Sequence, residues 1–184
     1  MPKSGKQTRS SIKLSWKKAG GAVSYIIYGG RCGKSGKMKQ LATGKGTSAT
    51  VKKIAGKKLA KGTYYKFLVL TLDQNKNVVS ASKVIHVATK GGKSGNISGL
   101  KLTGLKKARK TIKSGKTYKI KVSQTKGSKI KVKKHTGLRY ETSNATVATV
   151  TKAGKVKGVK KGNCKIYVCG QNGLVKTLKL TVKR

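Results

Sequence analysis

Apolar and polar residues alternate with a period of two along most of the chain. Successive side chains of a β-strand point to opposite faces, so this period predicts strands that each bury one face. No segment combines the 3.6-residue apolar period of a helix with capping residues at its ends. The clearest predicted strands are SIKLSW at 11–16, TYYKFLVLTL at 63–72, KIKV at 119–122, KIKV at 129–132 and LKLTVKR at 178–184.

These strands recur about every 8 to 12 residues and are separated by Gly, Asn and Lys-Gly turns, which is typical of antiparallel sandwiches. The Gly, Ser and Lys-rich stretch ATKGGKSGNISGL at 88–100 lacks a strong apolar run and divides the 184 residues near their middle. The sequence therefore predicts an all-β protein of two tandem immunoglobulin-like antiparallel β-sandwiches. The predicted limits are 1–90 and 98–184, with a linker at 91–97.

The first half resembles a fibronectin type III domain over about residues 10–89. The resemblance lies in SIKLSW with its tryptophan Trp16, in VSYIIYGG as the third strand, and in LAKGTYYKFLVLTL. In that last segment Tyr65 matches the family's tyrosine corner, together with Leu59, Gly62 and Thr63. The resemblance implies that the Tyr65 hydroxyl bonds to backbone upstream while its ring fills the corner between the sheets.

The start of the chain departs from this family. A fibronectin type III domain has a strand ahead of the tryptophan-bearing one, yet only about eleven mostly polar residues precede Ile12. Either another segment supplies that edge, or the chain begins partway into its first domain. We expect a truncated or C-terminal piece of a longer surface protein, which would also explain why MPKSGKQTRS lacks the apolar core of an export signal. No apolar run reaches the roughly 18 residues of a membrane span.

The second half resembles a bacterial immunoglobulin-like domain of group 2. The run LRYETSNATVATVTKAGKVKGVKKGNCKIYV follows that family's order of an aromatic strand, Ser-Asn, a Val-Ala-Val segment, a Gly turn, a Val-x-x-Val segment, a Lys-Gly turn and a strand. Gly154 and Gly162 are interpreted as turn glycines. The matching residues are Tyr140, Ser143, Asn144, Val147, Ala148, Val150, Gly154, Val156, Val159, Gly162, Ile166 and Val168.

The charge of the chain is extreme: 46 Lys and Arg residues face two acids, Asp73 and Glu141, for a formal +44. Only five of the cations are arginines. The planar Arg guanidinium is the group that binds base edges or phosphates bidentately, so the excess of lysine over arginine indicates diffuse, salt-sensitive attraction to polyanions. A merely solvated lysine-rich sheet would have the same composition. The candidate polyanion-binding residues are Lys119, Lys121, Lys129, Lys131, Lys133 and Lys134 in the second domain, and Arg31, Lys34 and Lys37 in the first.

The last three of these candidates belong to GGRCGKSGK at 29–37, which is superficially similar to a phosphate-binding P-loop. A P-loop requires a glycine five residues before Gly33, where this chain has Tyr28, and a helix afterwards, where KMKQLATG has no helical period. We therefore interpret the stretch as a hairpin connection whose cations lie at an exposed tip.

The remaining chemistry points away from catalysis. Asp73 lies in TLDQNKN, a predicted hairpin turn with local Asp and Asn bonds, and Glu141 lies in a strand. Because the two acids belong to different predicted domains, they do not form a glycosidase pair unless the domains fold together. Calcium would need clustered oxygen ligands, which this sequence lacks. His86 and His135 are interpreted as isolated strand and turn residues. We predict no enzymatic activity, no metal site and no cofactor.

The three cysteines match neither a disulfide framework nor a zinc spacing. Cys164 and Cys169 should point to opposite faces of one strand, with Cys164 on the inner face. Cys32, beside Arg31 and Lys34, should have a lowered thiol pKa if it is exposed, although an ordinary loop cysteine is the favoured interpretation.

Both resemblances imply a non-catalytic module of a bacterial cell-surface or secreted protein, with a role in spacing, adhesion or anchoring. We expect its lysines to bind an anionic cell-wall polymer such as teichoic acid, or an acidic glycan. A host or bacterial surface protein is a further candidate partner. Two alternatives remain: nonspecific nucleic-acid binding, against which the aromatic content of 5% speaks, and an accessory region of a larger wall or glycan hydrolase.

Overall fold

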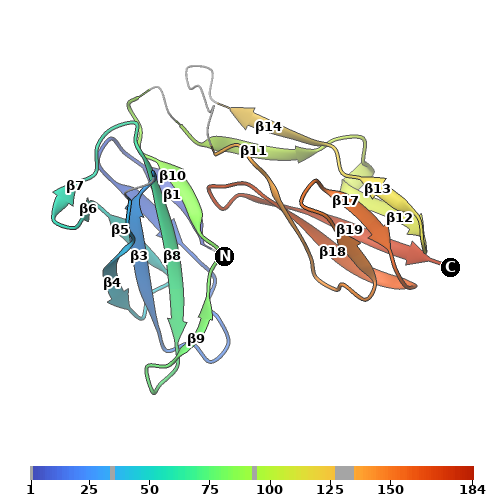
Figure 1. The fold of residues 1–184 in the computed structure, drawn as a ribbon, viewed down its shortest axis with the longest axis horizontal. Coiled ribbons are helices and arrows are strands. Elements are labelled where there is room, and N and C mark those ends of the chain that lie inside the picture. The colour runs from blue at the N-terminus through green and yellow to red at the C-terminus, as the bar shows by residue number, and fades with distance from the viewer. Residues whose placement is uncertain (1, 34–35, 93–94, 127–134) are drawn as a thin grey trace. The chain divides into compact units, whose positions relative to one another are not determined.

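The chain folds into two compact units in the computed structural model, which describes residues 2–33, 36–92, 95–126 and 135–184. One unit comprises Met1–Asn96 and Lys126–His135, and the other comprises Ile97–Thr125 and Thr136–Arg184. The regular elements of the described residues are β-strands and one 3-10 helix, η1 (Lys106–Ala108) (Figure 1). The predicted all-β fold of tandem immunoglobulin-like sandwiches is confirmed.

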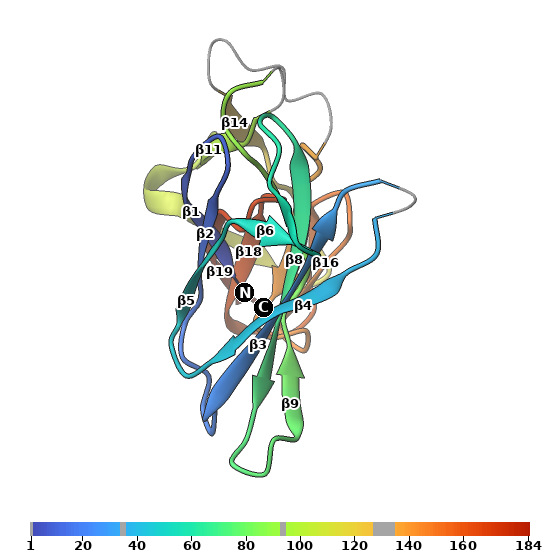
Figure 2. The ribbon, with the colours of Figure 1, turned by 90° about the vertical axis from the view of Figure 1, so that its left-hand side faces the viewer.

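The first unit is a sandwich of two antiparallel sheets (Figure 2). One sheet has the order β1 (Lys3–Gln7), β2 (Ile12–Ser15), β5 (Ser48–Val51). The other has the order β10 (Ile85–Ala88), β8 (Tyr64–Leu72), β3 (Ser24–Arg31), β4 (Lys39–Gly44), with β9 (Val78–Ala81) also on β8. The short strands β6 (Lys53–Ile54) and β7 (Lys57–Lys58) form a separate hairpin.

The core of this unit follows the period-two pattern. Tyr65, Phe67 and Val69 of β8 point inward and are buried, while Tyr64 and Lys66 belong to the opposite face of the sheet. The hydroxyl of Tyr65 accepts a hydrogen bond from the Ala60 backbone N–H at 2.8 Å, which is the tyrosine corner that the resemblance implied. Burying these alternate side chains is the main source of stability for such a sheet.

The expectation of a missing first strand is wrong. The polar segment KSGKQ forms β1 and pairs antiparallel with β2, with Lys3 opposite Ser15, Ser4 opposite Leu14 and a register shift before Gln7. Its side chains are exposed or half-buried, so the strand is held by backbone hydrogen bonds at a sheet edge and leaves no apolar signature.

The second unit also contains opposed sheets. One has the order β12 (Arg109–Lys113), β19 (Val175–Lys183), β18 (Gly162–Cys169), β15 (Arg139–Thr142), with β12 and β19 parallel. The others are β13 (Thr117–Lys119), β17 (Lys155–Gly158), β16 (Ala148–Val150), and the pair β11 (Ile97–Leu102) and β14 (Val122–Lys126). Their inward residues include Ile112, Val156, Ile166, Leu178 and Leu180.

A turn glycine in this unit is required for two reasons. Gly154 has a φ of +78°, a left-handed conformation that side chains with a Cβ rarely adopt. A Cβ at this position would also lie 2.7 Å from Cζ of the Tyr140 ring. The predicted turn at Gly154 is therefore confirmed.

The predicted strand at 119–122 is wrong in part. β13 ends at Lys119 and β14 begins at Val122, because the chain changes its pairing partner between them: the Ile120 N–H donates to the Gly154 carbonyl at 3.0 Å, whereas the Lys121 carbonyl accepts from Thr103 at 3.0 Å. The second KIKV segment, 129–132, lies outside the described residues. β11 begins at Ile97, so a strand includes the last residue of the predicted linker, of which residues 93–94 lie outside the described part.

Candidate functional site

The described members of the predicted polyanion-binding set are all exposed. Lys119 ends β13 opposite Lys155 of β17, and its ammonium donates to the Ala153 carbonyl. Lys121 follows Ile120 between β13 and β14. The other second-domain candidates, Lys129, Lys131, Lys133 and Lys134, lie outside the described residues.

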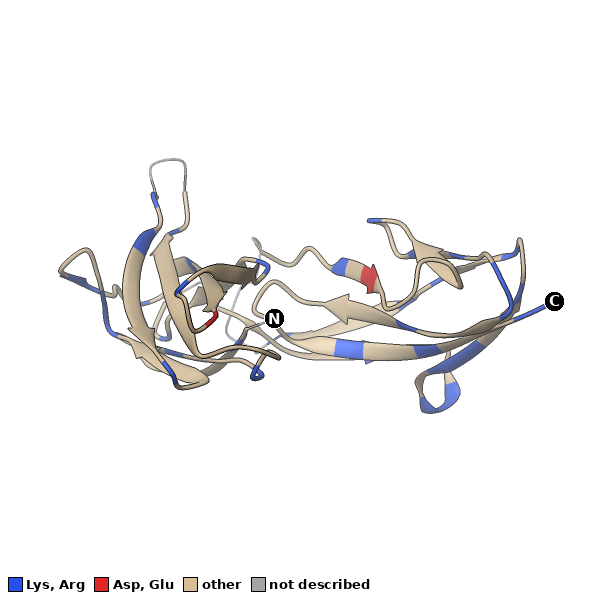
Figure 3. Ribbon diagram, turned by 90° about the horizontal axis from the view of Figure 1, so that it is seen from below, with Lys and Arg blue, Asp and Glu red and all other residues tan. Residues whose placement is uncertain are grey.

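In the first unit, Arg31 ends β3 and Lys37 precedes β4, so GGRCGKSGK connects two antiparallel neighbours as a hairpin, as predicted. Both cations are exposed, while Lys34 lies outside the described residues. Figure 3 shows Lys and Arg distributed over strands and loops of both units, with acidic positions at two places only.

The strongest concentration of charge in a fixed register is a face that the sequence did not predict. In the sheet β12-β19-β18-β15, Arg109 lies opposite Lys179, and Lys179 lies opposite Lys165 on its other side. All three side chains are exposed and belong to the outer face, because the neighbouring positions Leu180 and Ile166 are buried. We call Arg109, Lys179 and Lys165 the cation row.

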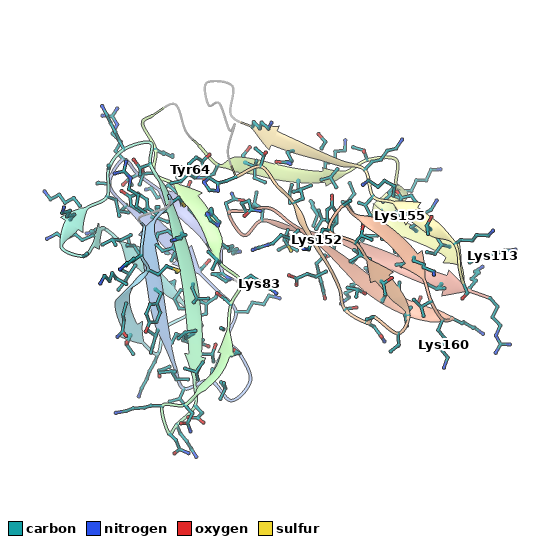
Figure 4. The ribbon with its side chains drawn as sticks, viewed as in Figure 1. Tyr64, Lys83, Lys113, Lys152, Lys155 and Lys160 are labelled. Carbon is teal, nitrogen blue, oxygen red and sulfur yellow. The ribbon has the colours of Figure 1, made fainter. Side chains whose placement is uncertain are left out.

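Polar groups continue this face on both sides of the cation row. The next cross-strand row consists of Thr111, Thr181 and Asn163, and the Thr181 hydroxyl donates to Asn163 Oδ1 at 2.8 Å. Beyond it, Lys113, labelled in Figure 4, lies opposite Lys183. The face thus alternates cations with hydroxyl and amide groups.

The cation row and its polar neighbours border a hollow of about 680 Å³. Ser143 and Tyr167 contribute to its lining, and the Ser143 hydroxyl accepts a hydrogen bond from the Lys165 backbone N–H at 2.8 Å. Such a surface offers ammonium, guanidinium and hydroxyl donors to the oxygens of a phosphate, sulfate or carboxylate.

Without a bound anion, the charges on this sheet face repel one another. Like charges placed directly opposite on neighbouring strands destabilise a sheet. The single acidic side chain of the second half, Glu141, lies on β15 opposite Tyr167, one row away from Lys165. A bound polyanion would compensate the cation row, which links anion binding to stability.

The sequence contained part of the signal for this face. NCKIYV and LKLTV each place a cation between apolar residues, whereas in ARKTIK the cation Arg109 is followed by Lys110. What the pattern could not supply is the register that aligns three cations, because β12 pairs in parallel with a strand far along the chain.

The histidines are not isolated, contrary to the sequence-based interpretation. Cys32 Sγ lies 3.2 Å from His86 Nδ1, and the His86 and His135 rings stack with centroids 4.6 Å apart at an interplanar angle of 21°. All three residues are half-buried. Each belongs to the first compact unit.

The environment of Cys32 also reverses the expected direction of its pKa. Burial raises the pKa of the Cys32 thiol to about 11, and the nearby charge of Lys66 offsets only part of this rise. The prediction of a lowered pKa assumed exposure, whereas desolvation is the larger effect here. Cys164 and Cys169 are buried, and none of the three cysteines forms a disulfide.

The other predicted chemistry agrees with the structure at Asp73. Its Oδ1 accepts hydrogen bonds from the backbone N–H groups of Asn75 and Asn77, both at 2.9 Å, in the turn between β8 and β9. The predicted local role of this acid is confirmed.

The second half of the chain matches a known family model. The model of the bacterial Ig-like domain (group 2) matches residues 101–182, and this is a non-catalytic domain type that typically occurs in bacterial surface proteins. A comparison with curated protein sequences gives no match. No helix in the described part of the chain has the length and apolar character to cross a membrane.

Solved structures with similar folds include the fibronectin type III domain of human fibronectin type III domain containing protein 3, which is 25% identical with a TM-score of 0.40 over 50% of this chain and 87% of that one. A two-domain fibronectin type III segment of chicken tenascin is 16% identical, with a TM-score of 0.36 over 98% and 97% of the two chains. The C-terminal 282-residue fragment of intimin, solved with the intimin-binding domain of the translocated intimin receptor, is 16% identical, with a TM-score of 0.34 over 100% and 64%.

The first unit has its own structural evidence for the predicted resemblance. Trp16 packs against the core beside Tyr25, with ring centroids 5.5 Å apart, and Tyr65 forms the corner hydrogen bond to Ala60. Its two sheets are those expected of a fibronectin type III sandwich, including the first strand. The chain therefore carries a fibronectin type III-like sandwich followed by a region, residues 101–182, that matches the model of the bacterial Ig-like domain (group 2).

Proposed function

We propose that this chain is a non-catalytic spacer and adhesion module of the bacterial cell surface, held against anionic polymers by its lysines. The observation that supports the proposal best is the cation row, in which Arg109, Lys179 and Lys165 lie directly opposite one another. A surface location is consistent with the family of residues 101–182.

The binding mechanism is multivalent Coulomb attraction with release of counterions. A formal charge of +44 with two acids leaves almost all cations without an internal partner charge. Each polymer charge that a cation neutralises releases condensed counterions, so the logarithm of the affinity falls linearly with the logarithm of the salt concentration. Wall teichoic acid, a phosphate polymer, is the partner class that fits this mechanism at a bacterial surface.

The proposal is tested by titrating the full chain with purified wall teichoic acid at increasing NaCl concentrations. We expect binding at low salt that is lost by about 0.5 M NaCl, where the Debye length is only a few ångströms. Binding that is unchanged at that salt concentration would refute the electrostatic mechanism. Duplex DNA serves as a second polyanion, and tighter binding to DNA than to teichoic acid at equal salt would favour the nucleic-acid alternative.

Two matched triple variants test the role of the cation row. R109Q/K165Q/K179Q removes the row, and K152Q/K155Q/K160Q removes three exposed charges elsewhere in the same unit (Figure 4). The first triple should reduce the salt slope by about 2 to 3, and the second by clearly less. Equal losses would assign binding to the whole cationic coat and would contradict a localised site.

A further inference from the structure

We propose that Cys32, His86 and His135 form a binding site for a thiophilic transition-metal ion, with Zn²⁺ as the representative ion. One ligand atom of each residue lies within 4.8 Å of the other two. This inference is independent of polyanion binding, because its residues belong to the first unit and not to the cation row.

The fold brings two of the ligands to one face of a sheet. His86 lies in β10 opposite Lys66 of β8, and the Cys32 N–H donates to the Tyr64 carbonyl of the same strand at 2.9 Å. The neighbouring residues Tyr65 and Val87 are buried on the inner face, so His86 and Cys32 belong to the outer face. Their side chains meet across β8, with 3.2 Å between Sγ and Nδ1.

The third ligand, His135, lies beside the pair in contact with two aromatic rings. His135 stacks on His86, and its ring centroid lies 4.4 Å from that of Tyr64, labelled in Figure 4. The Tyr64 hydroxyl donates to the Gly95 carbonyl, so this phenol is already engaged and is not counted as a ligand. His135 has a φ of +61°, which fixes its backbone in an uncommon conformation for a non-glycine residue.

The distances are close to those of a zinc centre. With Zn–S near 2.3 Å and Zn–N near 2.0 to 2.1 Å, tetrahedral geometry requires separations of about 3.3 to 3.6 Å between donor atoms. The Cys32–His86 pair, at 3.2 Å, lies just below this range, so the two donor atoms need only a small separation to hold the ion. The stacked rings do not direct their lone pairs to one point, so binding requires rotation of the His135 ring and a contraction of about 1 Å.

The donor set selects the kind of ion. One thiol and two imidazoles suit zinc and copper, whereas Ca²⁺ and Mg²⁺ need clustered oxygen ligands. Lys66 lies near Cys32 and the net charge is +44, so a cation must be held by strong coordination bonds to a thiolate and neutral imidazoles. Binding releases the thiol proton to solvent, and water completes a fourth position at this half-buried site.

The test is a titration of the full chain with Zn²⁺ by calorimetry and with Co²⁺ by absorption spectroscopy. We expect one ion per chain, a thiolate-to-cobalt charge-transfer band and the intense visible bands of tetrahedral Co²⁺. Cys32→Ser should abolish the charge-transfer band, and His86→Ala or His135→Ala should weaken zinc binding by at least about tenfold. Absence of zinc binding in the unmodified chain, or a wild-type affinity and spectrum in Cys32→Ser, would overturn the proposal.

Two control variants separate this site from adventitious thiol chemistry. Cys169→Ser removes a buried thiol and should leave the Co²⁺ spectrum unchanged. Cys164→Ser removes another buried thiol and should also leave the spectrum unchanged, whereas loss of the charge-transfer band in either variant would overturn the proposal. Tryptophan fluorescence, which reports on the core of the first unit through Trp16, verifies that the Cys32, His86 and His135 variants are folded, and far-UV circular dichroism verifies this for the second-unit variants.

Discussion

Lys179 occupies the centre of the cation row, so its replacement should have opposite effects on stability and on binding. Lys179→Gln removes the repulsion between Lys179 and its two like-charged neighbours, Arg109 and Lys165. Two unit charges about 6 Å apart in water repel each other by roughly 0.7 kcal/mol. Flexible side chains reduce this by moving apart, in line with the measured range of about 0.2 to 1 kcal/mol for cross-strand pairs. We expect Lys179→Gln to stabilise the second unit by about 0.5 to 1 kcal/mol at low salt.

Differential scanning calorimetry at low and high salt measures this gain. For a unit of this size, a gain of about 0.5 to 1 kcal/mol corresponds to an increase in Tm of roughly 2 to 8 °C. At about 1 M salt the Debye length falls to roughly 3 Å, so the gain should vanish. The same variant should bind teichoic acid more weakly, with a salt slope reduced by about 0.7 to 0.9.

Lys176→Gln is the matched control, because it lies on the same strand, is exposed and pairs with Val168. It removes one charge that has no cation directly opposite it, so its effect on Tm should be close to zero. Equal stabilisation by Lys176→Gln and Lys179→Gln, or a gain for Lys179→Gln that persists at high salt, would refute the repulsion argument.

Three further predictions concern the framework and the half-buried thiol. Tyr65→Phe removes the acceptor of the Ala60 N–H and should destabilise the first unit by about 1 kcal/mol; tryptophan fluorescence during urea unfolding measures it, and an unchanged midpoint would contradict the tyrosine corner. Gly154→Ala should destabilise the second unit by clearly more than Gly104→Ala, because both glycines have a positive φ but only Gly154 has an aromatic ring where the new Cβ would lie. Equal losses of unfolding free energy in calorimetry would show that the ring moves away easily. Since burial raises the pKa of Cys32 to about 11, little thiolate is present at pH 8 to 9. Labelling of Cys32 by iodoacetamide, followed by mass spectrometry, should therefore be slow at that pH and accelerate towards pH 11. Fast labelling below pH 9 would contradict the raised pKa.

Strands that bury every second side chain could be predicted from the sequence, whereas strands held by backbone pairing alone could not. β8 and β19 have alternating buried positions and were recognised from their period. β1 has no buried side chain, so only its backbone hydrogen bonds to β2 reveal it. The break at Ile120 was missed for a related reason, because a change of pairing partner does not alter the alternation of Lys and apolar residues.

Both candidate sites depend on registers between distant segments. The excess of lysine was evident from composition, but the alignment of Arg109 with Lys179 requires the parallel pairing of β12 and β19. Cys32 and His86 are 54 residues apart and meet across β8. Neither pair has a local spacing that a motif could recognise, which is why His86 was interpreted as isolated.

The composition of the cation row bears on what kind of polyanion it can distinguish. Arg109 offers the planar donor fork that binds a phosphate or carboxylate in two places, whereas Lys165 and Lys179 act as mobile point charges. A row with one fork and two point charges fixes the position of one anionic group and leaves the spacing of the others adjustable, because the lysine side chains can follow the polymer. We therefore expect discrimination by charge density rather than by monomer identity, which would suit the proposed adhesion to wall polymers of variable structure.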